Sequence, residues 1–238
     1  MLFPFLACAT AALGLLLLAG AGPAYRTGLL PLAGAFTLLR WAGYAGLAAS
    51  ALGVLAAGLA YVRAARLRML AALVGLLGGI AAFGIPFEFE RRQASAPPIH
   101  DISTDLENPP AFDAVVPLRT GAPNGLERPP AVADEQRKGY PDIAPVTLPE
   151  PQDQVFNRAL AAAQDAGWRI VTADLGRGRI EATDTSRWFG FTDDIVVRLL
   201  PWGSGTRVDM RSVSRLGRTD GGANARRIRR FLARLRSS

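Results

Sequence analysis

The residues best suited to chemistry lie close together near the C-terminus, between Gly205 and Leu232. The run Arg211-Ser-Val-Ser-Arg215 has the alternation of a strand, and Asp220, Asn224 and Arg227 follow it. Arginine side chains bind carboxylates and phosphates through two parallel hydrogen bonds. These residue types therefore suit a network of internal ion pairs, a site for an anionic ligand or, with a serine nucleophile, a catalytic centre.

Two adjacent acids upstream, Asp193 and Asp194, are natural partners for these arginines. The residues that we group as one polar network or anion-binding site are Asp193, Asp194, Arg211, Ser212, Ser214, Arg215, Asp220, Asn224 and Arg227. Arg211 and Arg215 are expected to donate to the aspartates of this set, or to a carboxylate or phosphate of a ligand. We favour the internal network, and we keep the anion site as an open alternative.

Catalysis is the less favoured interpretation, because general bases are scarce. The chain has one histidine, His100, and one cysteine, Cys8, which lies in an apolar run. These counts argue against a disulfide framework and against a zinc site of histidine and cysteine. We expect no metal and no cofactor. The alternative to a non-enzymatic protein is a hydrolase or transferase that uses Ser212 or Ser214 with Asp220 and His100.

The last helix is expected from about Gly222 to Arg236 and is strongly amphipathic. Its apolar stripe consists of Ile228, Phe231, Leu232 and Leu235. Arginines take most of the remaining surface, and three of them, Arg226, Arg229 and Arg230, are predicted to contact a membrane surface. Anionic headgroups attract such side chains. The alternative is a helix face that only improves solubility.

Residues 151–238 have the pattern of one small α+β domain. Apolar spacing predicts a helix around 155–163, and alternation predicts strands at 168–174, 179–184, 194–200 and 206–215. This order predicts two layers, an antiparallel sheet of about four strands with two helices on one face. The other face is expected to be uncovered and to carry crossing arginine and aspartate side chains.

A connector spans residues 93–150, and twelve prolines lie between residues 94 and 151. Proline interrupts helices and central strands, so regular structure is not expected here. Several apolar residues, among them Ile99, Phe112 and Tyr140, favour a segment that packs partly along the domain instead of a free tether.

Residues 1–92 are apolar enough for a membrane anchor of about three helices, at 2–22, 41–62 and 69–87. The apolar stretch at 28–39 either lies in the membrane interface or extends the second helix. The first span resembles a signal peptide but lacks a basic start, so an uncleaved helix is favoured. The closely spaced glycines suit tight packing of the three helices, or an anchor that oligomerises as a scaffold.

Charge predicts the orientation of this anchor. Arg63, Arg66 and Arg68 lie in the short loop between the second and third spans, which is therefore expected on the cytoplasmic side. The C-terminal domain then lies on the extracytoplasmic side of the inner (cell) membrane. The formal net charge is +7. Outside the cytoplasm this basic excess favours anionic lipid headgroups or another envelope protein as partner, and no nucleic acid.

The signature residues also carry a family resemblance. Asp193-Asp194, Arg211-Ser-Val-Ser-Arg215, Gly217, Asp220, Gly222, Asn224 and Arg227 resemble the signature of the domain-of-unknown-function 1499 family. The resemblance covers roughly residues 97–238, to which this chain adds the membrane anchor. Many members begin the domain with a cysteine motif, where this chain has Ile99-His-Asp-Ile-Ser-Thr-Asp105. The resemblance implies the domain and its polar signature, and it implies no reaction.

Overall fold

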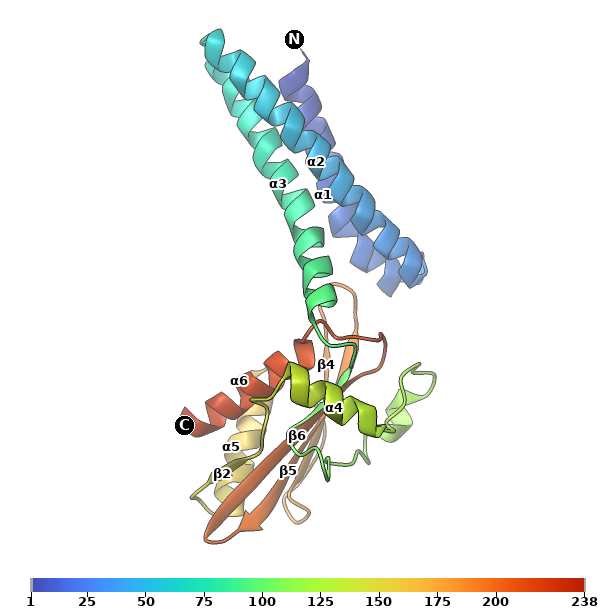
Figure 1. Cartoon of the computed structure of the whole chain (residues 1–238), viewed down its shortest axis with the longest axis vertical. Helices are drawn as coiled ribbons and strands as arrows, with labels where there is room; N and C mark the ends of the chain where they lie inside the picture. Colours follow the sequence, from blue (N-terminus) through green and yellow to red (C-terminus); the bar gives the residue numbers. More distant parts are fainter. Residues whose placement is uncertain (1, 238) are drawn as a thin grey trace. The chain divides into compact units, whose positions relative to one another are not determined.

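A computed structural model describes residues 2–237 and divides the chain into two compact units (Figure 1). The first consists of Met1–Arg92 together with the short segment Arg187–Gly190. The second consists of Gln93–Ser186 and Phe191–Ser238. The compact fold of the second unit thus begins at Gln93, well before the helix expected near residue 155.

The first unit contains three long helices, α1 (Phe3–Arg26), α2 (Leu32–Val62) and α3 (Arg66–Ser95). Each is long and apolar enough to cross a membrane, which confirms the prediction of three such helices. The stretch at 28–39, for which two placements were open, extends the second helix, and Pro31 stands at its N-cap. Proline has no N–H to leave unpaired at a helix start, so it suits this position.

Small residues allow these helices to approach closely. A Cβ added at Gly46 of α2 would lie 2.7 Å from the carbonyl oxygen of Gly79 in α3. A Cβ at Gly75 of α3 would lie 2.7 Å from the Cβ of Ala7 in α1. Such contacts leave no room for a side chain, so backbone packs directly against backbone. Phe189, from the short segment of this unit, lies buried with its ring centroid 5.8 Å from that of Phe36.

The second unit is built on one antiparallel sheet in the order β1-β6-β5-β4-β3, with β2 also paired to β6. The strands are β1 (Asp101–Ser103), β2 (Val146–Leu148), β3 (Arg169–Asp174), β4 (Arg179–Thr185), β5 (Thr192–Trp202) and β6 (Gly205–Ser214). The long strands β3 to β6 follow one another as predicted. The prediction of about four strands is wrong, because the proline-rich segment adds two strands of three residues each.

Helices α5 (Gln152–Asp165) and α6 (Ala223–Ser237) pack on one face of this sheet. Apolar residues alternate along the strands, and their inward side joins Phe156 of α5 and Ile228 of α6 in one core. The buried residues that the sheet contributes to it include Ile180, Ile195, Val197, Leu199, Val208 and Met210. Burial of these side chains is the main stabilising contribution of the fold.

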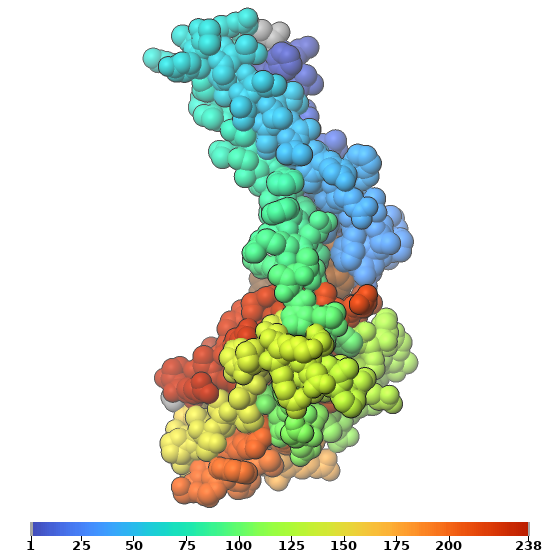
Figure 2. All heavy atoms as spheres, in the orientation of Figure 1, coloured from blue at the N-terminus to red at the C-terminus, as the bar shows by residue number. Residues whose placement is uncertain are grey.

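The proline-rich segment is not a bare connector. Besides β1 and β2 it forms a short 3-10 helix, η1 (Val116–Arg119), and helix α4 (Pro130–Gly139). The expectation that regular helix is absent here is wrong, since Pro130 opens α4 at the first helical position, where proline is favoured. In Figure 2 the green and yellow-green atoms of this segment make up much of the visible surface of the second unit.

The sheet face opposite α5 and α6 is covered as well, contrary to the expectation of an uncovered face. Glu181 points to this side and is fully buried. Its carboxylate accepts hydrogen bonds from the backbone N–H of Asp113, at 2.9 Å, and of Val115, at 3.0 Å. The covering segment is thereby attached to β4 by its own backbone, which the strand pattern alone did not indicate.

Candidate functional site

Asn224 is the centre of a polar network on the helix-covered side of the sheet. The Ser212 hydroxyl donates to Asn224 Oδ1 at 2.7 Å, and Asn224 Nδ2 donates to Ser214 Oγ at 3.0 Å. The same amide nitrogen donates to the backbone carbonyl of His100 at 3.0 Å. Asn224 and Ser212 are fully buried. The side chains of Asn224, Ser212 and Ser214 thus satisfy one another's hydrogen-bonding groups, as buried polar groups require.

Arg227 extends this network toward two aspartates. Its Nη2 donates to Asp193 at 2.6 Å and to Asp184 at 2.8 Å, while Nη1 donates to Ser212 Oγ at 3.0 Å. Burial lowers the pKa of Arg227, but the carboxylates of Asp193 and Asp184 raise it more, and the net pKa lies above the ordinary arginine value. Arg227 is therefore a fixed, charged and fully engaged donor.

Asp220 caps the start of α6. One carboxylate oxygen accepts the N–H of Gly222 at 2.9 Å, and the other accepts the N–H of Asn224. Gly221 and Gly222 adopt φ values of 57° and 77°, a left-handed conformation that favours glycine. Burial raises the pKa of Asp220, partly offset by these two backbone hydrogen bonds. The side chain thus acts as an N-cap and supports the position of Asn224.

Arg211 and Arg215 point to the opposite face of the sheet, where each meets a buried acid. Arg215 makes a bidentate pair with Asp194, at 2.9 Å from Nε and 2.8 Å from Nη2. Arg119, from η1, donates to the same carboxylate. Arg211 makes a bidentate pair with Asp101 of β1. The nine signature residues therefore divide between the two sides of the sheet, with one network around Asn224 on the helix-covered side and two ion-paired groups, around Asp194 and around Asp101, on the other.

A further ionic cluster lies on this second face. Asp209 is fully buried and accepts from Arg198 at 3.0 Å and from Arg207 at 3.0 Å. Asp105, from the covering segment, accepts from Arg207 at 2.8 Å. The pKa of Arg207 is raised, chiefly by its hydrogen bonds to Asp209. Charge pairs of this kind fix the covering segment in place.

Several partners were not among the predicted site residues, namely Asp101, Arg119, Asp184, Glu181 and Asp209. Asp101 and Arg119 come from the proline-rich segment, whose pairing with β6 has no signal in the local sequence. Asp184 and Glu181 lie on a predicted strand. Alternation assigns them to opposite faces of the sheet, which was the available clue to the side on which each finds its partner.

The arrangement does not assemble a nucleophile with a general base. Ser212 and Ser214 are bonded to Asn224, and Asp220 is occupied by backbone amides. No hydrogen bond joins the His100 imidazole to either serine within residues 2–237, although its backbone carbonyl adjoins them. The same residues contain no group of three or more histidine, cysteine, aspartate or glutamate side chains suited to a metal ion. The geometry therefore gives the hydrolase or transferase alternative no support.

The three arginines predicted to contact a membrane, Arg226, Arg229 and Arg230, differ in their hydrogen-bond partners. Arg229 makes a bidentate pair with Asp142, both bonds 2.6 Å, and its guanidinium lies 5.4 Å from the centroid of the Tyr140 ring. Arg226 donates to the carbonyl of Gly221 at 2.8 Å. Arg230 donates through Nε to the carbonyl of Arg226 at 3.3 Å, so its two terminal nitrogens are the best placed of the three for an external anion.

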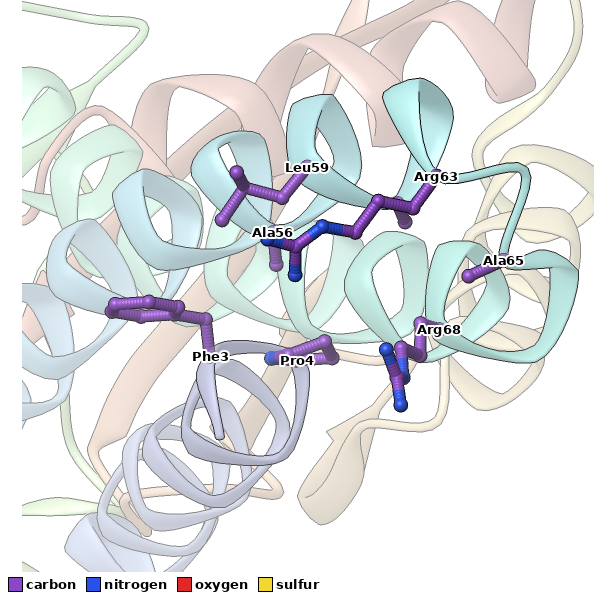
Figure 3. A pocket seen from close by; sticks show the side chains of 8 residues that line it. Phe3, Pro4, Ala56, Leu59, Arg63, Ala65 and Arg68 are labelled. Carbon is purple, nitrogen blue, oxygen red and sulfur yellow. The ribbon is translucent and has the colours of Figure 1, made fainter. Parts of the chain in front are cut away.

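A small pocket in the anchor is lined by Phe3, Pro4 and the arginines Arg63 and Arg68, among others (Figure 3). Its volume is about 20 Å³. A single water molecule needs roughly 10–15 Å³ on this measure. The pocket therefore has room for little more than one water, and it is no site for a substrate.

Comparison with known families gives one match, and comparison with curated proteins and with solved structures gives none. The family model for the protein of unknown function DUF1499 matches residues 101–235, more than half of the chain. The match begins at Asp101, the partner of Arg211, and includes all nine signature residues. The chain therefore belongs to the DUF1499 family, as the signature residues predicted, and three apolar helices precede its family domain.

Proposed function

We propose that this chain is a non-enzymatic module of the cell envelope, anchored in the inner membrane by α1–α3. Its α+β domain is exposed on the extracytoplasmic side and binds anionic lipid headgroups through the arginines of α6. The observation that carries this proposal is the internal pairing of the signature residues. Because Arg211, Arg215 and Arg227 are all bonded to acids of the domain, they are not left for a partner, and we assign the partner contact to the exposed arginines of α6.

The anchor supports the proposed sidedness. Arg63, Arg66 and Arg68 lie in and around the turn between α2 and α3, and basic residues next to spans favour the cytoplasmic side. With that turn in the cytoplasm, α3 runs outward and the domain follows it.

The sidedness is tested with single cysteines introduced into a Cys8→Ala chain. One is Leu67→Cys, near the turn, and the other is Ser204→Cys, in the domain. A membrane-impermeant maleimide added to intact cells should label Ser204→Cys and spare Leu67→Cys, and the reverse pattern would overturn the sidedness.

The lipid contact is tested with the full chain in nanodiscs. An environment-sensitive dye is attached at an exposed position of α6 through Ala233→Cys, again with Cys8→Ala. Its fluorescence should increase when anionic lipid replaces part of a zwitterionic bilayer, and the increase should fade with added salt because exposed charges are screened. Arg226→Gln, Arg229→Gln and Arg230→Gln combined should abolish the response without loss of folding. A response that is absent, or that salt leaves unchanged, would contradict lipid binding.

A further inference from the structure

A groove lies between α5, the start of β3, the end of β4 and α6, and Figure 1 shows α5 (yellow) and α6 (red) next to each other. Its volume is about 400 Å³. Ligand sites in proteins commonly enclose about 300–1,000 Å³. The lining residues are Ala162, Ala166, Trp168, Asp184, Arg227, Arg230, Phe231 and Arg234. None of these except Arg227 and Arg230 belonged to the predicted site.

One arginine with no acidic partner in the described part of the chain favours an anion in this groove. The lining has three arginines and one aspartate, +2 in all, and the ion-pair partners Asp193 and Asp165 bring the sum to zero. Arg227, Arg230 and Arg234 are spaced at i, i+3 and i+7, so they lie on one face of α6. Arg227 is bonded to Asp184 and Asp193 at one end of this row, and Arg234 is paired with Asp165 at the other. Arg230, between them, forms no ion pair within residues 2–237.

The groove also has an apolar wall. Trp168 and Phe231 are stacked, with ring centroids 5.1 Å apart and an interplanar angle of 26°. Ala162 and Ala166 line it from α5, where their small side chains keep it open. A ligand that fills it therefore needs a compact anionic group next to a short apolar part.

We propose that this groove binds the phosphate group of a single anionic phospholipid. The phosphate lies on Arg230, because its planar guanidinium matches phosphate oxygens, whereas Arg227 and Arg234 on either side are held by aspartates. The glycerol carbons lie against Ala162, Ala166 and the Trp168–Phe231 stack. A lipid suits this groove better than free phosphate, since half of the wall is apolar and the chain carries its own membrane anchor.

This inference rests on the proposed function and makes it more specific. In place of a general attraction to a charged bilayer, it assigns one bound lipid headgroup to one groove. The experiment titrates the full chain, held in zwitterionic nanodiscs, with a short-chain, water-soluble phosphatidic acid in a calorimeter. Saturable binding of one lipid per chain is expected. Short-chain phosphatidylcholine and inorganic phosphate serve as the comparison ligands, and both should bind much more weakly.

Two variants address the two sides of the groove. Arg230→Gln should weaken phosphatidic acid binding by roughly tenfold to a hundredfold, the range for a hydrogen-bonded charge. Its matched control is Arg236→Gln, which removes the same charge from an exposed position of α6 outside the groove. Ala166→Trp should block the groove without changing charge, whereas Ala161→Trp, exposed on α5 outside the groove, should not. Circular dichroism confirms that each variant is folded.

The outcomes separate this inference from the proposed function. Equal weakening by Arg230→Gln and Arg236→Gln would overturn the groove and leave general electrostatic binding intact. Equal affinity for inorganic phosphate would show a phosphate site that does not recognise lipid, and equal affinity for phosphatidylcholine would show that the anion is not recognised. Absence of binding would also overturn the groove. The proposed function fails separately, if the dye on α6 does not respond to anionic bilayers.

Discussion

Asp101 accepts two hydrogen bonds from Arg211, at 3.0 Å from Nε and 2.7 Å from Nη2, across the pairing of β1 with β6. Each side chain is 6% exposed. Arg211 also donates to the backbone carbonyls of Pro110 and Leu126. One arginine of the family signature thus joins the central strand to three points of the segment that covers it. This arrangement explains why a strand rich in charge can lie inside the domain.

Removal of one partner of this pair should be costly. Asp101→Asn would leave Arg211 and Arg128 without their shared counterion, and Arg211→Met would leave Asp101 with Arg128 alone, 3.7 Å away. Breaking a buried ion pair typically costs about 3–5 kcal/mol of unfolding free energy. The double variant Asp101→Asn with Arg211→Met should lose less stability than the sum of the two single variants, because both changes break the same ion pair. Denaturant unfolding of the full chain in detergent measures the free energy of unfolding of each variant. Single variants as stable as the parent would show that the pair does not stabilise the domain.

Glu181 should control the attachment of the covering segment. Glu181→Gln keeps one carbonyl oxygen but replaces the other acceptor with an N–H donor, so either Asp113 or Val115 loses its hydrogen bond. An unsatisfied buried amide costs about 1–3 kcal/mol. Hydrogen exchange at residues 113–119 should therefore accelerate by roughly tenfold to a hundredfold.

The matched control for Glu181→Gln is Glu135→Gln, which breaks an exposed ion pair with Lys138 and should leave exchange at residues 113–119 unchanged. Equal exchange rates in the parent chain and in Glu181→Gln would show that the carboxylate does not hold the segment.

The ionisation of Asp220 should contribute to the pH dependence of the free energy of unfolding. Burial raises its pKa in the folded chain, so the folded state binds this proton more tightly than the unfolded chain does. Its contribution to stability is therefore fully present below the unfolded pKa of about 3.9, and it is lost as the pH rises through the folded pKa. Asp220→Asn keeps an oxygen for the N-cap but does not ionise. The difference in unfolding free energy between variant and parent should shift in favour of the variant as the pH rises through this range, and a flat difference would contradict the prediction.

The sequence predicted the parts of the fold that carry long, regular patterns. Strands β3 to β6 and helices α5 and α6 each extend over at least six residues, which is enough for alternation or helical spacing to be recognised. Strands β1 and β2 have three residues each, too few for a pattern. The prolines that lie on either side of these two segments argued against strands. The residues between the prolines keep their backbone N–H groups and are able to pair with β6.

The pairing within the candidate site was predicted only in part. Local sequence indicated that Arg211 and Arg215 would donate to Asp193, Asp194 or Asp220. Arg215 pairs with Asp194, but for Arg211 the prediction is wrong, because its partner is Asp101, outside the predicted set. Local sequence could not show that Arg211 and Arg227 belong to opposite sides of the sheet. The partner of Arg211 lies 110 positions away, so only the register of β1 on β6 brings the two together.

The glycines of α2 give a matched test of the anchor. A Cβ at Gly46 would lie 2.5 Å from the backbone nitrogen of Phe83 and 2.7 Å from the carbonyl of Gly79, whereas a Cβ at Gly43 would meet nothing within 4 Å. Gly46→Ala should therefore separate α2 from α3 and lower the midpoint of thermal unfolding in detergent. Gly43→Ala, on the same helix, should leave the midpoint unchanged or raise it slightly, because alanine favours helix more than glycine does. Equal midpoints for the two variants would mean that close packing at Gly46 does not hold the helices together.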